Sequence, residues 1–443
     1  EVKRAGDSFN ELDVGYFVSE SELAQYTQEE RVRYESGDKK GKLRMYAKGT
    51  FIYRLAGRER EKSASYYTPE VLTKCLVKYT LKELLKGKSA DDILHLTICE
   101  PAMGSAAFLN EAINQLAEAY ISRKEQETGE IIGYEDRFNQ LQKVKMFIAD
   151  RNVYGVDLNP VAVELAEVSL WLNTIYPNGF VPWFGTQLVN GNSLIGARRQ
   201  CYRVSSLQAT SKGLRWYEKA PERVPLGTER KRGKLAAQIY HFLLGDPGMC
   251  SYTDKVIKQL EPAKIKFLNT WNKAFIVPYS DDDIETLKKL SKIIDKLWKD
   301  QIALRQQLKQ QTHDSLSVFK FNDDEPDSHT SIRTKDQMLR TMYRSENAKN
   351  AGAYARLKFA MDYWCALWFW PIDKADLLPS RSEFLNDMYL ILVGLYSTNS
   401  DSQQLSMLED ADEEDTDILL QVNLDELCAL LPRLRLARTI AQQ

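Results

Sequence analysis

Three polar side chains stand directly after short apolar runs in the first half of the sequence. Glu100 follows the run at 93–98, Asp157 ends the segment NVYGVD, and Asn192 ends the segment LVNGN. The carboxylate of Asp157 can accept hydrogen bonds from the two adjacent hydroxyls of a ribose, and the amide of Asn192 can bind an adenine edge. These residue types therefore indicate contacts to a ribose and to an adenine.

The stretch ICEPAMGSAAFLNEA at 98–112 predicts a tight turn between a strand and a helix. The run at 93–98 is short and rich in branched apolar side chains, as expected of a buried parallel strand, whereas the apolar residues from Phe108 to Ala119 recur at helical spacing. The small residues at 104–106 leave backbone N–H groups free at the carboxyl end of the strand. Ligands of open α/β sheets bind at such ends.

Three more segments predict elements around this turn. SYYTPEVL at 65–72 predicts a helix with Thr68 as its N-cap and Pro69 at its first position, and such an N-terminus can bind a carboxylate. The segment at 152–172 predicts a strand followed by a helix that Asn159 and Pro160 open, and LVNGNSLIGA at 188–197 predicts a third strand or turn. Residues 61–200 therefore alternate strands and helices, which predicts an α/β domain.

The order of the motifs TPE, EPAMGSAAF, GVDLNP and GNSL resembles the gamma-class, adenine-N6-specific DNA methyltransferases. This family includes type I modification subunits, fused type II restriction-modification enzymes and large phage-defence methylases. The resemblance covers about residues 55–200, a third of the chain. It implies a Rossmann-like α/β core that binds S-adenosylmethionine, DNA as the substrate, and methyl transfer to N6 of adenine.

The resemblance also implies roles for individual residues. Thr68 and its helix N-terminus would bind the methionine end of the cofactor, and Glu100 with the Gly104 turn would line the same end. Asp157 would accept the ribose hydroxyls and Asn192 would bind the adenine. The implied cofactor site consists of Thr68, Pro69, Glu100, Pro101, Ala102, Gly104, Asp157, Leu158 and Asn192.

The chain departs from the family pattern in the turn motif. Where the family has Asp-Pro-Ala, the chain has Glu100-Pro101-Ala102, and where the family has Gly-Ser-Gly, it has Gly104-Ser105-Ala106. The acid is thus one methylene longer, and the last glycine is replaced by alanine.

The catalytic motif of the family is absent from the sequence. In the family, an Asn-Pro-Pro-aromatic loop accepts hydrogen bonds from the amino group of a flipped base and stacks on its ring. None of the 14 prolines here adjoins another, and the nearest match, 246–249 (DPGM), lacks the second proline and the aromatic ring. The expectation is that the chain ends before this loop, so no catalytic residue is assigned.

Other readings of the chain remain open. It could be a degenerate methylase that keeps the cofactor fold for structural reasons, or a non-catalytic cofactor-binding or scaffold subunit of a defence complex. A Rossmann-like dehydrogenase is disfavoured because a GxGxxG motif is absent after the first strand. The separation of Glu100 and Asp157 also far exceeds the usual ~20 residues to the acid that binds the ribose.

The pattern along the chain predicts four regions. Residues 1–60 are an N-terminal connecting segment with one strand at LRMYAKGTFIYRL (43–55), residues 61–200 are the cofactor-binding domain, residues 201–400 are a mainly helical insertion, and residues 401–443 are an acidic linker and a terminal helix. Leucine and isoleucine spacing between Leu287 and Leu308 predicts a long amphipathic helix. The tryptophan-rich segment at 363–370 is expected to lie in the core.

Charge is distributed unevenly although the net charge is only −2. Residues 198–234 hold eleven Lys or Arg against three Glu, whereas residues 401–417 hold eight acids and no base. The basic block is either a solvated loop or a surface that contacts DNA phosphates. The residues that would make such contacts are Arg198, Arg199, Arg230, Lys231, Arg232 and Lys234.

Composition restricts the class of protein further. The content is 43% hydrophobic and 28% charged, with no apolar run near the ~20 residues of a membrane span and no signal peptide, which predicts a soluble protein. Six scattered cysteines without a CxxC pair argue against a zinc site and against a disulfide framework, and favour the reducing cytoplasm. The first residue is Glu1 rather than methionine, as expected of a processed or excised piece.

Overall fold

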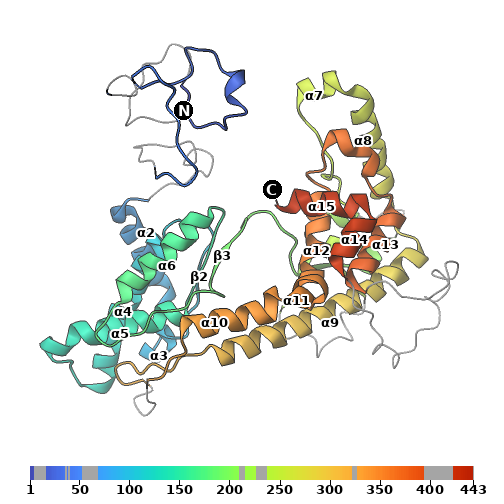
Figure 1. The fold of residues 1–443 in the computed structure, drawn as a ribbon. Helices are drawn as coiled ribbons and strands as arrows, with labels where there is room; N and C mark the ends of the chain where they lie inside the picture. Colours follow the sequence, from blue (N-terminus) through green and yellow to red (C-terminus); the bar gives the residue numbers. More distant parts are fainter. Residues whose placement is uncertain are drawn as a thin grey trace. The chain divides into compact units, whose positions relative to one another are not determined.

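A computed structural model describes residues 1–3, 16–34, 37, 40–51, 68–208, 215–225, 237–321, 327–393 and 423–442 (Figure 1). The chain forms two units. Unit 1 comprises Glu1–Ser193 and Leu316–Pro326, and unit 2 comprises Leu194–Ser315 and Asp327–Gln443. The division after Ser193 lies seven residues before the boundary placed at 200/201 from the sequence.

Unit 1 contains a parallel sheet of three short strands. These are β1 (Ile98–Glu100), β2 (Val153–Asp157) and β3 (Leu188–Asn190), in the order β1-β2-β3. The register pairs Ile98 with Val153 and Asp157 with Asn190. The predicted parallel α/β arrangement of this segment is confirmed.

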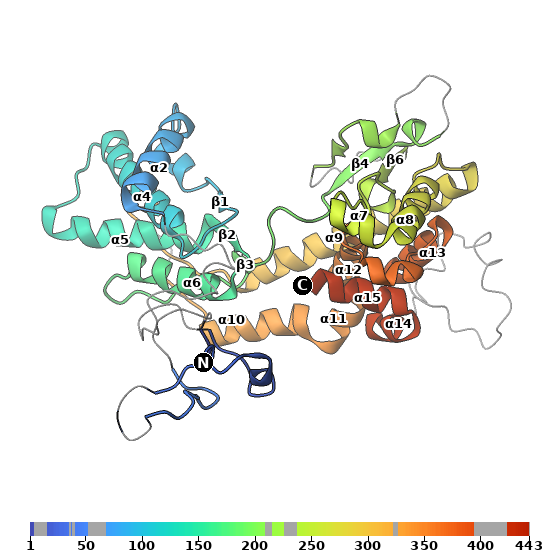
Figure 2. The same cartoon turned by 90° about the horizontal axis from the view of Figure 1, so that it is seen from above.

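Five helices accompany the sheet in unit 1. They are α2 (Glu70–Leu84), α3 (Ala90–Ile93), α4 (Ala107–Thr128), α5 (Tyr134–Arg151) and α6 (Pro160–Thr174). One side of α4 packs in the same core as Val153 and Leu188, which lie on the buried face of the sheet. Helix α2 lies beside α4 (Figure 2). On the opposite face of the sheet, Cys99 and Val189 are exposed.

The α/β core is completed by a distant segment of the chain. Leu316 and Val318, only 1% and 2% exposed, pack in the core of unit 1, and the Tyr120 hydroxyl donates to the carbonyl of Phe319 at 2.7 Å. The sequence did not indicate this return, because a run of six residues carries no periodic pattern of its own.

Two predicted strands differ from the structure. The parallel strand expected at 93–98 is present but begins only at Ile98. The earlier part of the run is the end of α3 and a turn, because Ser89 and Asp92 form a capping box that starts a helix at Ala90. In the strand predicted at 43–55, the described part has one isolated bridge, at Leu43, and then a turn in which Gly49 has a φ of +87°. Residues 52–55 lie outside the described residues.

Unit 2 combines a small sheet with many helices. Its strands β4 (Gln200–Arg203), β5 (Glu222–Arg223) and β6 (Gln238–Tyr240) are antiparallel in the order β5-β4-β6. The helices are α7 (Lys255–Leu260), α8 (Pro262–Phe275), α9 (Asp281–Gln311), α10 (Ile332–Leu339), α11 (Glu346–Ala351), α12 (Ala353–Ala366), α13 (Arg381–Leu392), α14 (Leu424–Leu430) and α15 (Pro432–Gln442). The sequence did not indicate this sheet, since strands of two to four residues are too short to show alternation.

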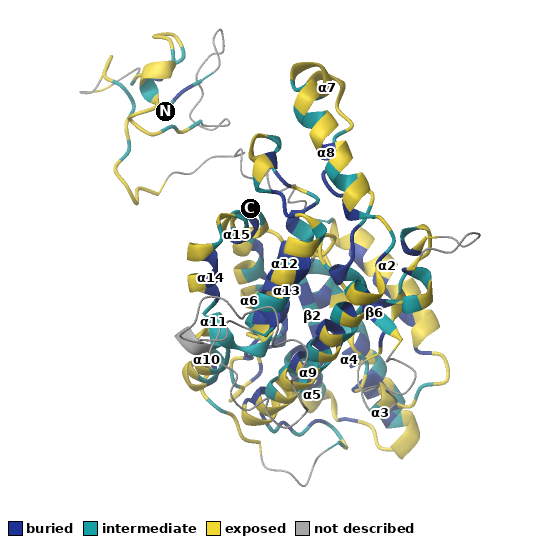
Figure 3. Ribbon diagram, turned by 90° about the vertical axis from the view of Figure 1, so that its right-hand side faces the viewer, coloured by how far each residue is buried: buried dark blue, intermediate teal, exposed yellow. Residues whose placement is uncertain are grey.

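The core of unit 2 is aromatic. Tyr363 and Trp370 are fully buried, and α12 and α13 are largely buried while α7 is exposed (Figure 3). The prediction that the tryptophan-rich segment lies in the core is confirmed, except that Phe369 is 53% exposed. The predicted long amphipathic helix is also confirmed. Its apolar side is buried at Ile284, Leu287, Leu290, Ile294, Leu297 and Leu308 of α9.

Within the described ranges, the structure has no helix that is both long enough and apolar enough to cross a membrane.

One ion pair in unit 2 is completely buried. The Lys335 ammonium, in the first turns of α10, donates to the Asp314 carboxylate, and the two side chains are 2% and 1% exposed. The other carboxylate oxygen of Asp314 accepts from the N–H of Thr330 at 3.0 Å. These contacts connect α10 to the segment that follows α9.

Lys335→Ala should lower the free energy of unfolding of unit 2 by about 3–5 kcal/mol, because it leaves a buried carboxylate without its cation. Urea denaturation followed by tryptophan fluorescence measures this change, since six of the eight tryptophans lie in unit 2. The control is Lys358→Ala, which removes an exposed pair with Asp362 and should cost less than about 1 kcal/mol. Equal losses in the two variants would contradict the assignment.

Candidate functional site

The three parallel strands of unit 1 end at one edge of the sheet. Glu100, Asp157 and Asn190 are the last residues of β1, β2 and β3. Because the strands are parallel and adjacent, their carboxyl ends expose backbone groups side by side, which is where open α/β sheets bind ligands. The acids singled out in the sequence therefore start from neighbouring strand ends.

Two backbone N–H groups of the turn after β1 donate hydrogen bonds to residues of β2. The N–H of Met103 donates to the carbonyl of Val156 at 3.1 Å, and the N–H of Gly104 donates to Oδ2 of Asp157 at 2.8 Å. Gly104 has a φ of +53°, and no heavy atom lies within 4 Å of the point where a Cβ would stand. The turn thus presents an open backbone surface next to the Asp157 carboxylate.

The Met103 side chain fills the space over Gly155. Met103 is 3% exposed, and a Cβ at Gly155 would stand 2.2 Å from its sulfur. A side chain at position 155 would therefore displace Met103 from this space. Neither residue was assigned a role from the sequence, although a glycine inside a strand is the usual signal of a close approach.

Ala106 begins α4 in the left-handed backbone conformation, with φ of +67° and ψ of +30°. This conformation costs a residue with a Cβ about 1–2 kcal/mol, whereas glycine adopts it freely. The alanine found where the family has glycine therefore accepts a strained backbone here. The fully buried methyl group of Ala106 offsets part of that strain through packing.

Asp157 uses both carboxylate oxygens to hold the protein. Oδ2 accepts from Gly104, and Oδ1 accepts from the N–H of Asn159 at 2.9 Å. An ionised carboxylate offers about four acceptor positions, so about two remain. Since Asp157 is only half-buried, these positions suit two adjacent hydroxyl donors.

The end of β3 is joined to the end of β2 by Asn190. Its Nδ2 donates to the carbonyls of Asp157 and Leu158, both at 3.0 Å, and the N–H of Gly191 donates to the carbonyl of Asp157 at 2.9 Å. The exposed Asn192 follows immediately, so the chain brings it to the same edge. Asn190 was not predicted as a site residue, although it is an amide at the end of an apolar run.

Leu158 and Asn159 lead from this edge into α6. The Asn159 side chain caps α6 by accepting from the N–H of Val161 at 3.0 Å, with Pro160 at the first helical position as predicted. Leu158 is 61% exposed. An apolar side chain therefore borders the strand ends.

Thr68 and Pro69 differ from their predicted positions. The N-cap of α2 is Pro69 rather than Thr68, and no side chain caps the helix. In the described part of the chain, neither residue shares a hydrogen bond with Glu100, Gly104 or Asp157. The helix is displaced by one residue because Pro69 itself takes the extended backbone, with a ψ of 140°.

The environment of Glu100 disfavours its charged form. Its Oε1 accepts from the N–H of Ala102 at 3.3 Å, and Pro101 and Ala102 are exposed. Burial raises the pKa of the Glu100 carboxyl, and the Ala102 N–H opposes that rise. Partly buried acids whose pKa is raised by burial are frequent at functional sites.

The 246–249 segment is a tight turn inside unit 2. Oδ1 of Asp246 accepts from the N–H of Gly248 at 2.8 Å, and Gly248 lies against the Trp368 ring so closely that a Cβ would stand 2.3 Å from it. Asn272 donates to the carbonyls of Asp246 and Met249. These contacts give the segment a packing role.

The structure describes two of the six residues predicted to contact DNA, Arg198 and Arg199. Arg198 is exposed, and its N–H donates to Nε2 of His241 at 2.9 Å. The Arg199 guanidinium lies 5.8 Å from the centre of the Trp298 ring, so it packs rather than projects into solvent. Arg230, Lys231, Arg232 and Lys234 lie outside the described residues.

In the ranges that the structure describes, His, Cys, Asp and Glu side chains form no group of three that could hold a metal ion. All six cysteines lie in those ranges and have free thiols.

Comparison with known proteins finds a family and a relative similar to part of this chain. Residues 45–192 match the family described as N-6 DNA methylase. A Methanocaldococcus jannaschii protein, named as a candidate type II restriction enzyme and methyltransferase, is 26% identical over 163 residues. That match covers 27% of this chain and 13% of the relative, so the chain spans only a small part of the relative's length.

Glu100→Gln should raise the melting temperature at pH 7. Folding raises the pKa of Glu100 above its ordinary value of 4.5. At pH values above 4.5 the folded state therefore binds more protons at Glu100 than the unfolded state does, so ionisation of Glu100 lowers the stability of the fold as the pH rises. The gain in the variant should vanish below about pH 4.5. Thermal melts across pH 4–8 measure it, and a gain independent of pH would refute the assignment.

Proposed function

We propose that the chain carries the cofactor-binding part of a site-specific DNA methyltransferase, because residues 45–192 match the N-6 DNA methylase family. The methyl group would pass from S-adenosylmethionine to N6 of adenine. The observation that carries the proposal is the hydrogen bond between Gly104 and Asp157 at the carboxyl ends of two parallel strands, inside the matched segment. It supports a Rossmann-like core with its ligand at this edge.

The residues at this edge fit the proposed cofactor by their chemistry. Asp157 has two acceptor positions left for the ribose hydroxyls, and the open backbone at Gly104 leaves room beside them. Glu100 supplies a carboxylate that gains a counter-charge when a cationic ligand binds. Asn192 is proposed for the adenine, and Thr68 and Pro69 for the methionine end.

The chemistry that S-adenosylmethionine supplies is a methyl group on a sulfonium, which an amine can take directly. The part of this chain would be to bind and orient the cofactor, since positioning accounts for much of the rate of such transfers. A base acceptor of the Asn-Pro-Pro-aromatic type is absent from residues 1–443. We propose that this acceptor comes from outside these residues.

The wider setting follows from the proposed substrate. We propose that the protein acts on DNA in the cytoplasm within a restriction-modification or phage-defence system, since the Methanocaldococcus jannaschii relative is named for both restriction and methylation. Nuclease or other defence subunits would be its partners. The basic block that begins at Arg198 would contact DNA phosphates.

A second candidate is a non-catalytic cofactor-binding or scaffold subunit of a defence complex. The absence of the Asn-Pro-Pro-aromatic motif favours it. The two candidates differ in whether adenine is methylated when the missing acceptor is supplied.

Asp157→Ala should weaken binding of S-adenosylmethionine by about 1.5–3 kcal/mol, the usual value of hydrogen bonds to a charged group. Calorimetric titration measures the change. Because Asp157 also holds the Gly104 turn, the matched control is Asn190→Ala, which loosens the same edge through backbone contacts but keeps the carboxylate. Asn190→Ala should cost less than about 1 kcal/mol, and similar losses in both variants would remove Asp157 from the ligand contacts.

Residues 1–443 alone should not label duplex DNA from tritiated S-adenosylmethionine, because they have no acceptor for a flipped adenine. Labelling of adenine should appear when an Asn-Pro-Pro-aromatic segment is supplied, as chain past Gln443 or as a second polypeptide. The control is the same protein with the motif's Asn replaced by Ala. Adenine labelling by residues 1–443 alone would show that other residues do the chemistry, and absence of labelling in every case would favour the scaffold candidate.

A further inference from the structure

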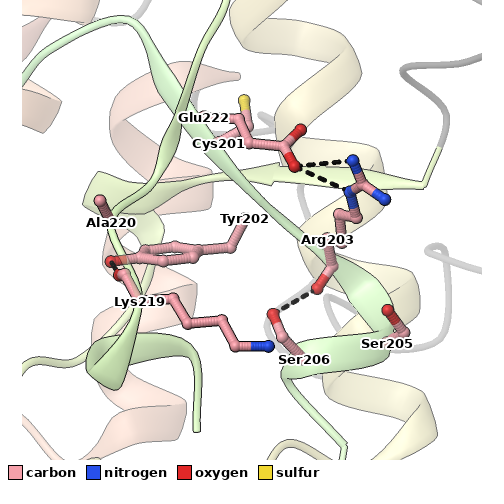
Figure 4. Close-up of a pocket in the computed structure, with 8 residues that line it drawn as sticks. All are labelled: Cys201, Tyr202, Arg203, Ser205, Ser206, Lys219, Ala220 and Glu222. Atoms are coloured by element: carbon pink, nitrogen blue, oxygen red, sulfur yellow. Dashed lines mark hydrogen bonds and ion pairs between the residues drawn. The ribbon is translucent and has the colours of Figure 1, made fainter. Parts of the chain in front are cut away.

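A polar pocket of about 310 Å³ lies on the small sheet of unit 2 (Figure 4). It is formed by β4, by the short 3-10 helix Val204–Ser206 after it, and by the residues that lead into β5. Its lining consists of Cys201, Tyr202, Arg203, Ser205, Ser206, Lys219, Ala220 and Glu222. None of these residues belongs to the proposed cofactor site.

The acid in the pocket is neutralised within the protein. Oε1 of Glu222 accepts from Nε and NH2 of Arg203 at 2.9 and 2.8 Å, and Oε2 accepts from Nε2 of Gln238 at 2.8 Å. Both oxygens are therefore occupied, and the Arg203–Glu222 pair adds no net charge. The acid does not repel an anion in the pocket as a solvated carboxylate would.

Lys219 then gives the lining its net positive charge. Its ammonium has no ion pair among the described residues, and the side chain runs along the Tyr202 ring toward Ser206 (Figure 4). The Tyr202 hydroxyl donates to the backbone carbonyl of Lys219 at 3.1 Å, which fixes the start of that side chain over β4.

Serine hydroxyls complete a donor set for an oxyanion. The Ser206 hydroxyl donates to the carbonyl of Arg203 at 2.7 Å, so its proton is engaged, whereas Ser205 is exposed and has no such bond in the described part of the chain. Burial raises the pKa of the Cys201 thiol to about 12, so no thiolate opposes an anion there. The available donors are thus one ammonium, one hydroxyl and the outer N–H groups of Arg203.

We propose that this pocket binds a phosphate of the DNA backbone, an inference that rests on DNA being the substrate in the proposed function. Lys, Arg, Ser and Tyr side chains are the usual donors to DNA phosphates. Pockets for whole small molecules are lined mainly by apolar and aromatic side chains, and here only Ala220, Cys201 and one tyrosine ring are of that kind. A phosphodiester, which needs no apolar wall, fits this lining better than a free nucleotide.

The sequence around the pocket favours the same ligand. Among the described residues, Arg198, Arg215 and Arg223 near the pocket in the sequence are exposed. The predicted contacts Arg230–Lys234 fall between β5 and β6 in the sequence. The pocket thus lies within the basic block rather than apart from it, so long-range attraction and a specific phosphate contact would act together.

The test is the salt dependence of DNA binding, measured by fluorescence anisotropy with two labelled duplexes of unrelated sequence. Lys219→Gln should reduce the slope of log affinity against log salt by about 0.9, the value for one phosphate contact, and equally for both duplexes. Ser205→Ala should weaken binding twofold to threefold without changing the slope. Lys266→Gln, which removes an exposed lysine of α8 outside the pocket, is the matched control and should leave affinity and slope nearly unchanged.

A slope that stays the same in Lys219→Gln, or falls equally in Lys266→Gln, would overturn the proposal, as would a wild-type chain that does not bind DNA. A second arm titrates ATP and inorganic phosphate into the chain: binding that Lys219→Gln removes, with an unchanged DNA slope, would assign the pocket to a free phosphate compound instead. No cofactor is present in either arm. Failure of the methyltransferase assignment would appear only in the labelling and calorimetric experiments, so the two failures are distinguishable.

Discussion

The carboxylate of Asp157 is the constraint on which the α/β edge depends. It accepts from Gly104 after β1 and from Asn159 before α6, while Asn190 at the end of β3 and the following Gly191 donate to the backbone carbonyl of Asp157. One residue therefore connects three strand ends. Shape and recognition at this edge are consequently coupled: any change at Asp157 alters the turn as well as the contacts available to a ligand.

The close approach of the turn to β2 has a steric basis. Gly155 gives the space that Met103 fills, and Ala106 accepts a left-handed backbone so that α4 can begin directly after the turn. Strain of this kind persists only where surrounding packing determines it. The buried side chains of α4, including Leu109 and Ile113, supply that packing.

Sequence patterns predicted what depends on local chemistry. The glycine-containing turn after Glu100, the strand that ends in Asp157 and the helix opened by Asn159 and Pro160 were recognisable because each rests on a few adjacent residues. The roles assigned to Asp157 and Asn192 stay predictions. Asn190 was missed because its contacts, the carbonyls of Asp157 and Leu158, are more than 30 residues away in the sequence.

The predicted element boundaries that differ from the structure also have physical causes. A capping box at Ser89 overrode the apolar run at 93–98, and Pro69 displaced the start of α2 by one residue. Short strands such as β5, of two residues, depend on partners that sequence periodicity does not reveal. Local capping thus decided the two helix starts and tertiary pairing decided the short strands, whereas the periodicity of long helices such as α9 was sufficient to predict them.

The segment Leu316–Phe321 gives unit 1 an unusual folding requirement. Leu316 and Val318 fill its core and Phe319 accepts from Tyr120, yet they leave the ribosome more than 120 residues after β3. During synthesis, part of the apolar surface of the sheet and its helices therefore stays open to solvent until residues 194–315, including all of α9, have been made. A chaperone or an early neighbour that covers this surface would shorten that exposure, and a gene fragment cut after Ser193 would encode a core with a permanent gap.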